Sequence, residues 1–217
     1  MGNFRAIILD FETTGLSPDC GDRTIEVGAV VVEDGAIVDR FQSLMNPGIK
    51  VSGFIESYTG ITNQMLSSAP PVAEVMRRLA GFIGRHPLVA HNASFDRRFL
   101  DAEFARIGHA RRQEVACSML LARRIYPEAP CHTLETLVRY KNLQTTGVHH
   151  RALADAEMTA HLWISLVEDL KRRHALREVP FDLLLQISRL PKAKVPAHLD
   201  EYRGTLPEVS PEPTTTI

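Results

Sequence analysis

Residues 4–15 read FRAIILDFETTG, an apolar run that ends in two carboxylates and a turn-forming glycine. A short aliphatic run bounded by polar residues predicts a buried β-strand, here over residues 4–10. Side chains alternate across a strand, so Asp10 and Glu12 project to one side and Phe11 to the other. The stretch therefore predicts a buried strand that presents an acidic pair at its carboxyl end.

Further strands surround this one in the predicted sheet. Two β-rich runs, over residues 24–33 and 36–45, are separated by Asp34-Gly35. An Asp-Gly pair between apolar runs is typical of a tight hairpin, so these two strands are expected to be antiparallel neighbours. Shorter apolar runs predict the remaining strands, over residues 88–91 and 115–119.

Segments with helical periodicity alternate with these strands. Helices are expected over residues 53–59, 72–84, 94–107, 133–141, 151–173 and 181–190, and between the last strand and Pro127. The helix that starts near residue 94 is expected to be N-capped near residues 92–94. Alternating strands and helices favour an α/β domain, with helices flanking a central mixed five-stranded sheet.

The length of 217 residues suits one domain with additions at its C-terminus. Residues 1–178 are expected to form the domain, and residues 179–203 a C-terminal helical extension. Residues 204–217 are rich in Pro, Thr and Glu, a composition typical of a disordered tail. Residues 186–190 (QISRL) weakly match a clamp-binding peptide, but their place in an expected helix favours packing into the core.

Composition bounds the compartment and the partners. The three cysteines, Cys20, Cys117 and Cys131, form no CxxC pair, which opposes a disulfide framework and favours a reducing compartment. The N-terminal apolar run is too short for a signal peptide or a membrane span, so a cytoplasmic protein is expected. A net charge of −1 opposes sequence-blind coating of nucleic acid, although seven arginines between Arg97 and Arg124 could steer a phosphate backbone.

Two further acidic residues follow later elements of the predicted fold. Asp96 comes after the strand over residues 88–91, and ligands of α/β sheets bind at the carboxyl ends of strands. Asp155 lies in the first turns of the long predicted helix, with His150 in the loop before it. Each alone has an ordinary explanation, such as a charge that complements a helix dipole. Together, four carboxylates offer hard oxygen ligands for two divalent cations, Mg²⁺ or Mn²⁺.

The motifs occur in an order that resembles a known family. Residues 10–15 (DFETTG), residues 91–96 (HNASFD) and His150 with Asp155 resemble the three exonuclease motifs of the DnaQ-like, or DEDDh, superfamily. The resemblance covers roughly residues 4–175. It implies an RNase H-like fold and a 3′–5′ exonuclease that releases nucleoside 5′-monophosphates from the 3′ end of a nucleic acid.

Position in these motifs implies how the metal ions would be held. Asp10, Glu12 and Asp155 would hold the metal on the nucleophile side. Asp10 would also bridge to the second metal, and Asp96 would support that metal directly or through water. These four residues and the general base make up the catalytic set that the resemblance implies.

The general base in this set is His150, which would orient and deprotonate the attacking water. It is preferred to its neighbour His149 because it has the five-residue offset from Asp155 that the family shows. A histidine with an ordinary pKa near 6.5 suits this proton transfer. Weaker contacts to the terminal nucleotide are expected from five residues, namely Thr13, Thr14, Gly15, Asn92 and Phe95.

Three functions are compatible with these residues. The favoured one is a free-standing exonuclease that trims the 3′ ends of single-stranded nucleic acid, DNA before RNA. The second is a proofreading subunit within a DNA polymerase complex, similar in kind to the epsilon subunit of a bacterial replicative polymerase. The third is a binding module that keeps the fold without catalysis, which the intact set of five catalytic residues disfavours.

Overall fold

The computed structural model describes residues 5–143 and 151–204 of the chain. Its strands are β1 (Arg5–Thr13), β2 (Thr24–Glu33), β3 (Ala36–Leu44), β4 (Leu88–Ala90) and β5 (Val115–Cys117). Its α-helices are α1 (Gly53–Thr59), α2 (Asn63–Ser67), α3 (Val72–Ile83), α4 (Ser94–Arg106), α5 (Ser118–Ile125), α6 (Leu134–Tyr140), α7 (Ala152–His174), α8 (Phe181–Arg189) and α9 (Val195–Gly204). Short 3₁₀ helices cover Pro18–Cys20 and Lys192–Lys194.

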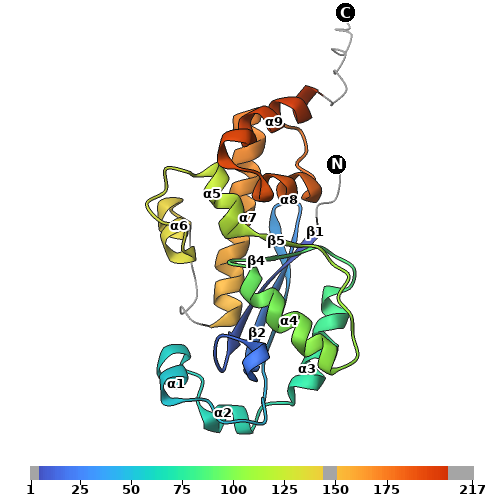
Figure 1. Cartoon of the computed structure of the whole chain (residues 1–217), viewed down its shortest axis with the longest axis vertical. Coiled ribbons are helices and arrows are strands. Elements are labelled where there is room, and N and C mark those ends of the chain that lie inside the picture. The colour runs from blue at the N-terminus through green and yellow to red at the C-terminus, as the bar shows by residue number, and fades with distance from the viewer. Residues whose placement is uncertain (1–4, 144–150, 205–217) are drawn as a thin grey trace, which may run out of the picture.

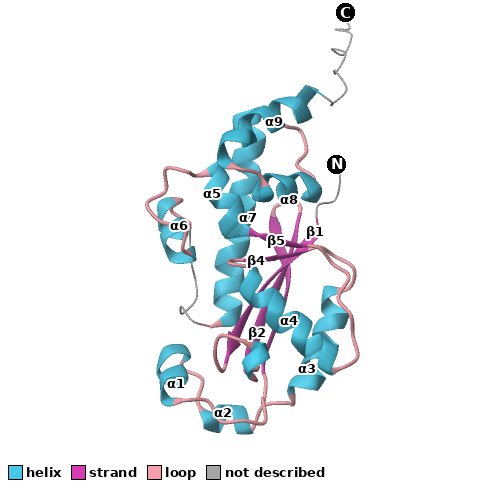
Figure 2. Ribbon diagram, viewed as in Figure 1, coloured by secondary structure: helices cyan, strands magenta, loops and turns pink. Residues whose placement is uncertain are grey.

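The strands form one mixed sheet in the order β3-β2-β1-β4-β5, which confirms the predicted architecture (Figure 2). β2 and β3 form the predicted hairpin, and its turn residues Asp34 and Gly35 have φ angles of 49° and 81°. Such a two-residue turn needs positive φ at both positions, which explains the Asp-Gly pair. β4 pairs with β1 in parallel at Ile7 and Ile8, so the end of β1 leaves this pairing.

Helices cover both faces of the sheet (Figure 1). One hydrophobic cluster joins Ala6, Ile8 and Val30 to α5, α7 and α8, and the other joins Ile7 and Leu9 to α3 and α4. Burial on two faces explains why β1 and β2 are nearly continuous apolar runs. Even-numbered residues of β1 therefore face α7, and odd-numbered residues face α3 and α4.

Most helices begin and end within two residues of their predicted limits. α2 is not predicted, and α9 is expected only as part of the helical extension over residues 179–203. Each of these helices buries only one or two apolar residues, which gives no periodic pattern. α4 begins at Ser94 as expected, and its N-cap is Ala93. The N-cap therefore lies within the predicted residues 92–94, although no side chain caps the helix there.

The helices after residue 178 pack against the preceding domain. Leu184 and Ile187 of α8 are buried in the same hydrophobic cluster as Ala6 and Ile8. Within residues 186–190, Ile187 and Ser188 are thus buried in this packing, as their place in the expected helix favoured, while Gln186 and Arg189 are exposed. Among the described residues, no helix combines the length and the apolar character that a membrane span needs.

Candidate active site

The carboxyl end of β1 carries the acidic pair expected from the sequence. Asp10 and Glu12 are even-numbered residues of β1 and lie on the α7 face, while Phe11 belongs to the opposite hydrophobic cluster. Oxygen atoms of Asp10, Glu12 and Asp155 all lie within 4.8 Å of one another. Two residues of a strand and one residue of a helix thus form a three-carboxylate group.

Asp155 reaches this group because the first turn of α7 lies unusually close to the sheet. Gly28 is the register partner of Asp10 on β2, and a Cβ atom at Gly28 would lie 2.1 Å from the backbone nitrogen of Leu153. Ala152 and Ala156 of α7 are also buried and small. Because β2 and α7 carry only small residues at this contact, the helix lies close enough to the sheet for Asp155 to reach Asp10 and Glu12.

Asp96 approaches from the other side of β1, where β4 has stopped pairing with it. It is the third residue of α4, only 3% exposed, and lies outside the three-carboxylate group. Its Oδ1 atom accepts a hydrogen bond from the backbone N–H of Phe11 at 3.2 Å. That bond fixes Asp96 to the strand between Asp10 and Glu12, and its charge acts on both of them.

Burial and like charge make this group costly to ionise without a cation. Burial, followed by the charges of Asp96, Asp155, Glu12 and Glu26, raises the pKa of Asp10 well above its usual value of 3.8. Burial and the neighbouring carboxylates raise the pKa of Glu12 to about 8. Burial raises the pKa of Asp96 to about 7, against the lowering effect of backbone hydrogen bonds.

A hard divalent cation relieves this repulsion, because it favours the ionised form of every carboxylate around it. The donor set consists of carboxylate oxygens, which suits Mg²⁺ or Mn²⁺ better than a softer metal. The residues present therefore fit a divalent cation site at Asp10, Glu12 and Asp155.

The turn after β1 holds the residues that the sequence suggested as substrate contacts. The Thr13 hydroxyl donates to the Gly15 carbonyl at 2.6 Å, and the Thr14 hydroxyl donates to Asp22 at 3.1 Å. A Cβ atom at Gly15 would lie 2.4 Å from Asp22, so the turn closes tightly around that carboxylate. The side chains of Thr13 and Thr14 thus shape the turn, and their contact with substrate stays a prediction.

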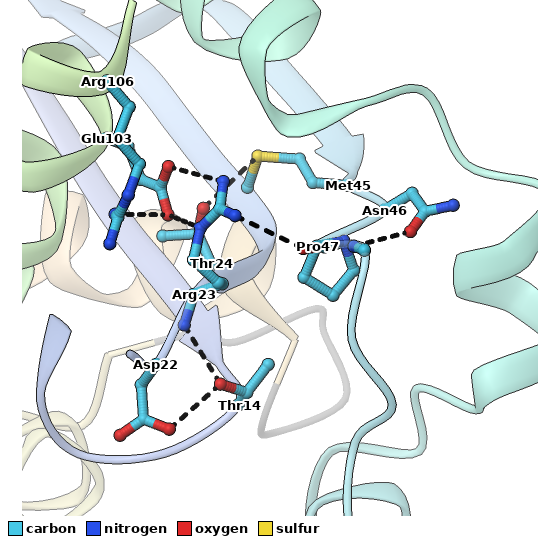
Figure 3. A network of polar contacts seen from close by, with 10 residues as sticks. Thr14, Asp22, Arg23, Thr24, Met45, Asn46, Pro47, Glu103 and Arg106 are labelled. Carbon is cyan, nitrogen blue, oxygen red and sulfur yellow. Dashed lines mark hydrogen bonds and ion pairs between the residues drawn. The ribbon is translucent and has the colours of Figure 1, made fainter. Parts of the chain in front are cut away.

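A polar network ties this turn to α4 (Figure 3). The backbone N–H of Arg23 donates to the Thr14 hydroxyl. The Arg23 side chain pairs with the buried Glu103 of α4 through two bonds of 2.7 and 3.0 Å. Arg106 adds a further contact to Glu103 at 3.1 Å, and Arg23 also donates to the Pro47 carbonyl. The network fixes α4, and with it Asp96, relative to the end of β1.

The two expected contacts before and within α4 differ in exposure. Asn92 is exposed and has a positive φ of 61°, at the turn between β4 and α4. Phe95 is half-buried and packs on Phe99 with ring centroids 5.0 Å apart. His149 and His150 lie outside the described residues, and the structure begins again at Arg151.

Residues that the sequence pattern did not single out also border the site. Glu26 is fully buried on the α7 face of β2, opposite Glu12, and pairs with Arg151 at 2.7 Å. The available signal was a charged residue inside the apolar run of β2, since a buried glutamate is nearly always paired. Leu16 and Phe54 are 79% and 73% exposed, which hydrophobic periodicity does not predict.

Comparisons with known proteins agree with this geometry. The model of the RNase_T exonuclease family matches residues 7–163. DNA polymerase III PolC-type from Bacillus cereus is 41% identical over 165 residues, and that from Bacillus subtilis is 40% identical over 165 residues. These matches cover 76% and 75% of this chain, which spans only 11% of the length of either polymerase.

Solved exonuclease structures also match this chain, and the match covers a larger share of their length. A structure of exonuclease X in complex with 5′ overhanging duplex DNA is 29% identical, with a TM-score of 0.67 over 84% of this chain and 99% of that chain. The nuclease domain of 3′hExo bound to rAMP shares the fold, with 20% identity and a TM-score of 0.66 over 77% of this chain and 94% of that one. The chain therefore belongs to the DnaQ-like, DEDDh family of 3′–5′ exonucleases.

Proposed function

We propose that the chain removes nucleotides from the 3′ ends of single-stranded DNA and releases nucleoside 5′-monophosphates in a two-metal reaction. The observation that carries the proposal is the group formed by Asp10, Glu12 and Asp155, whose oxygens lie within 4.8 Å of one another. Repulsion among these buried carboxylates is relieved by divalent cations, so metal binding and the ionised state of the group favour each other.

The proposed chemistry divides between bound ions and the protein. Two divalent cations supply stabilisation of negative charge on the attacking and leaving oxygens of the phosphodiester. Asp10, Glu12 and Asp155 would hold these ions, with Asp96 supporting them from α4. His150 would take the proton of the attacking water, and its neighbour Arg151 is anchored beside the group.

Exposed apolar and aromatic side chains next to the carboxylates support an unpaired substrate end. Phe54 and Tyr58 on α1 stack with ring centroids 5.9 Å apart and planes 10° from parallel. Burial, and then the charges of Glu12, Asp155 and Asp10, raise the pKa of Tyr58, so this ring lies within the electrostatic reach of the site. Aromatic faces bind unpaired bases by stacking, which base pairs of a duplex do not offer.

Basic residues beside Asp96 offer contacts to the phosphate backbone. Arg97 and Arg98 are exposed on the first turn of α4, and Arg98 donates to the Leu16 carbonyl at 3.4 Å. Arg106 and Arg111 of the basic stretch are paired with Glu103 and Asp101 instead. Arg97 and Arg98 are therefore the proposed phosphate contacts, because they directly follow Asp96 on α4 and are exposed.

DNA is preferred to RNA as the proposed substrate because exonuclease X was solved with DNA and the PolC-type relatives are DNA polymerases. The same relatives favour a second candidate, namely proofreading within a polymerase complex. Size-exclusion chromatography with a polymerase subunit separates the two, because a proofreading subunit co-elutes with the polymerase and a free-standing enzyme does not.

The test of the proposed function is a time course on 5′-labelled single-stranded DNA, single-stranded RNA and mismatched duplex. With Mg²⁺ or Mn²⁺, the wild-type chain is expected to shorten DNA stepwise from the 3′ end. Asp10→Ala and Asp155→Ala are each expected to lose the rate by on the order of 10³-fold or more while remaining folded. Asp200→Ala, on exposed α9, is the control and should leave the rate unchanged.

Two results of this time course would count against the proposal. Full activity in purified Asp10→Ala or Asp155→Ala would remove the assignment of the site. Faster degradation of RNA than of DNA would leave the site in place and overturn the substrate.

A further inference from the structure

Glu26 is a buried negative charge that the proposed reaction does not use. Its side chain has no solvent exposure, although it stands directly opposite Glu12 in the β1–β2 pairing. Opposite residues of an antiparallel pair share one face of the sheet, so Glu26 and Glu12 face α7 together. A carboxylate placed here adds to the repulsion within the site, because its charge raises the pKa of both Asp10 and Glu12.

The hydrogen bonds of Glu26 show what compensates for this cost. Arg151 donates to it from Nη2 at 2.7 Å and from Nε at 3.1 Å. The backbone N–H of Ala152 donates at 3.0 Å, and the Gln42 side chain donates at 2.9 Å. Both oxygens are thus occupied by protein donors, and Glu26 is absent from the three-carboxylate group. It is built to hold protein atoms and not a metal ion.

The atoms that Glu26 holds are those that start α7. Arg151 is the N-cap residue of this helix but makes no capping bond with its own side chain. Glu26 supplies the missing acceptor from another element, because Ala152 carries the first N–H group of the helix. Asp155 follows one turn later, and His150 is the residue directly before Arg151.

We propose that Glu26, Arg151 and Gln42 form a latch whose role in the proposed reaction is to position Asp155. The latch binds the start of α7 at both the Arg151 side chain and the Ala152 backbone N–H. Displacement of a reacting group by about 1 Å can lower a rate on the order of 10²-fold. The inference rests on the proposed function, and it makes Glu26 and Arg151 positioning residues that touch neither substrate nor metal.

A second ion pair between the sheet and α7 provides a matched control. Arg40 of β3 donates to Glu157 of α7 at 2.6 Å. This pair joins the same helix to the same sheet but makes no contact with the first N–H of α7. Arg40→Gln therefore removes a more exposed ion pair between the same helix and the same sheet without releasing the start of the helix.

The first experiment compares Glu26→Gln, Arg40→Gln and the wild-type chain at saturating Mn²⁺. Glutamine keeps the size of Glu26 but places an amide N–H₂ group against the Arg151 guanidinium. Two donors then face each other, so the contact between residue 26 and Arg151 is lost. We expect kcat on single-stranded DNA to fall roughly 10- to 100-fold in Glu26→Gln, with KM within about twofold of the wild type. Arg40→Gln should keep the wild-type kcat.

Metal binding gives a readout that does not depend on activity. Calorimetric titration of Mn²⁺ into each metal-free protein should show weaker binding in Glu26→Gln, because Asp155 is no longer held in place. The expected loss of affinity is roughly 10-fold or more, with no change in Arg40→Gln. Unchanged Mn²⁺ affinity together with unchanged kcat in Glu26→Gln would overturn the proposal.

Chemical rescue distinguishes positioning from general stabilisation. Arg151→Ala leaves a space beside Glu26 that a small guanidinium ion can fill. Added guanidinium at low, non-denaturing concentration should raise the kcat of Arg151→Ala saturably and leave the wild type and Arg40→Gln unchanged. The kcat of Arg151→Lys should lie between those of Arg151→Ala and the wild type, because an ammonium group cannot make the two-point contact with Glu26.

The outcomes separate this inference from the proposed function. If the wild-type chain shows no metal-dependent degradation, the proposed function fails, and Mn²⁺ affinity alone tests the latch. If the wild-type chain is active but guanidinium does not rescue Arg151→Ala, the positioning role fails and the site assignment stands. A rise in KM at unchanged kcat would also overturn the latch, since it would place Glu26 in substrate binding.

Discussion

At the scale of single residues, the site concentrates like charge on one face of two paired strands. Asp10 and Glu12 face α7 from β1, and Glu26 faces it from β2. Two of these carboxylates need a cation to ionise together, whereas Glu26 is neutralised by Arg151. Side chains of one chemical type thus serve either as metal donors or as structural anchors, according to their hydrogen-bond partners.

Proton transfer is assigned at this scale to His150. His150→Ala is expected to lower kcat roughly 10²- to 10⁴-fold, the usual contribution of a general base, while Mn²⁺ affinity is retained. His149→Ala serves as the matched control and should keep the wild-type kcat. Steady-state kinetics with calorimetric Mn²⁺ titration measures both quantities. If His149→Ala loses the rate instead, the base is His149.

At the scale of elements, the height of α7 above the sheet is set by small residues. Gly28 lies under the backbone of Ala152 and Leu153, so the helix start and the strand meet without an intervening side chain. This contact brings Asp155 to Asp10, the register partner of Gly28. The distance between Asp155 on the helix and Asp10 on the strand therefore depends on Gly28.

Gly28→Ala tests this dependence. The new methyl group would overlap backbone atoms at 2.1 to 2.3 Å, so α7 must move away from β2. Overpacking of this kind is expected to lower the free energy of unfolding by about 1–3 kcal/mol or more, and to weaken Mn²⁺ binding. Denaturant unfolding and calorimetric titration measure the two effects.

Gly81→Ala is the matched control for this change. A Cβ atom at Gly81 meets nothing within 4 Å, and the residue lies inside α3. Alanine in a helix is more stable than glycine by about 0.5–1 kcal/mol, so this variant should unfold no earlier than the wild type. Equal stability of Gly28→Ala and Gly81→Ala would contradict the close approach of α7.

At the scale of the whole molecule, the buried carboxylates link folding stability to pH and to metal. The pKa of Glu12 is raised from 4.5 to about 8, and that of Asp96 from 3.8 to about 7. The folded protein therefore keeps protons that the unfolded chain has lost. The stability that these groups contribute is complete below their unfolded pKa values and is lost as pH rises through their folded values.

Thermal unfolding of the metal-free protein tests this linkage between about pH 6.5 and pH 8.5. The buried His91, whose pKa is lowered from 6.5 to about 4, acts in the opposite direction, and its contribution still changes only at the lower end of this window. We expect Tm to fall as pH rises in EDTA, with a smaller fall in Glu12→Gln. Mn²⁺ should raise Tm more at the upper pH, and an equal rise at both pH values would contradict the linkage.

Local patterns in the sequence were sufficient for most elements of the fold. The aliphatic runs of β1 and β2, and the Asp34-Gly35 turn between β2 and β3, depend only on neighbouring residues, as does the long periodicity of α7. The order of the strands was not predicted beyond the β2–β3 hairpin, because pairing between strands that are distant in the sequence is a tertiary contact. α2 could not be predicted, and α9 was expected only as part of a helical extension, because short helices are held by tertiary contacts more than by their own pattern.

The sequence by itself determined which residues are proposed to carry the chemistry, because motif order and spacing are properties of the chain. It placed Asp10 and Glu12 on one side of β1 through the alternation of a strand. Only the tertiary structure decided that Asp155 joins them while Asp96 binds the Phe11 N–H, and that Glu26 is held by Arg151. Such partnerships join residues up to 145 positions apart, as Asp10 and Asp155 are, and they depend on the packing of α7 over the sheet, which local patterns do not record.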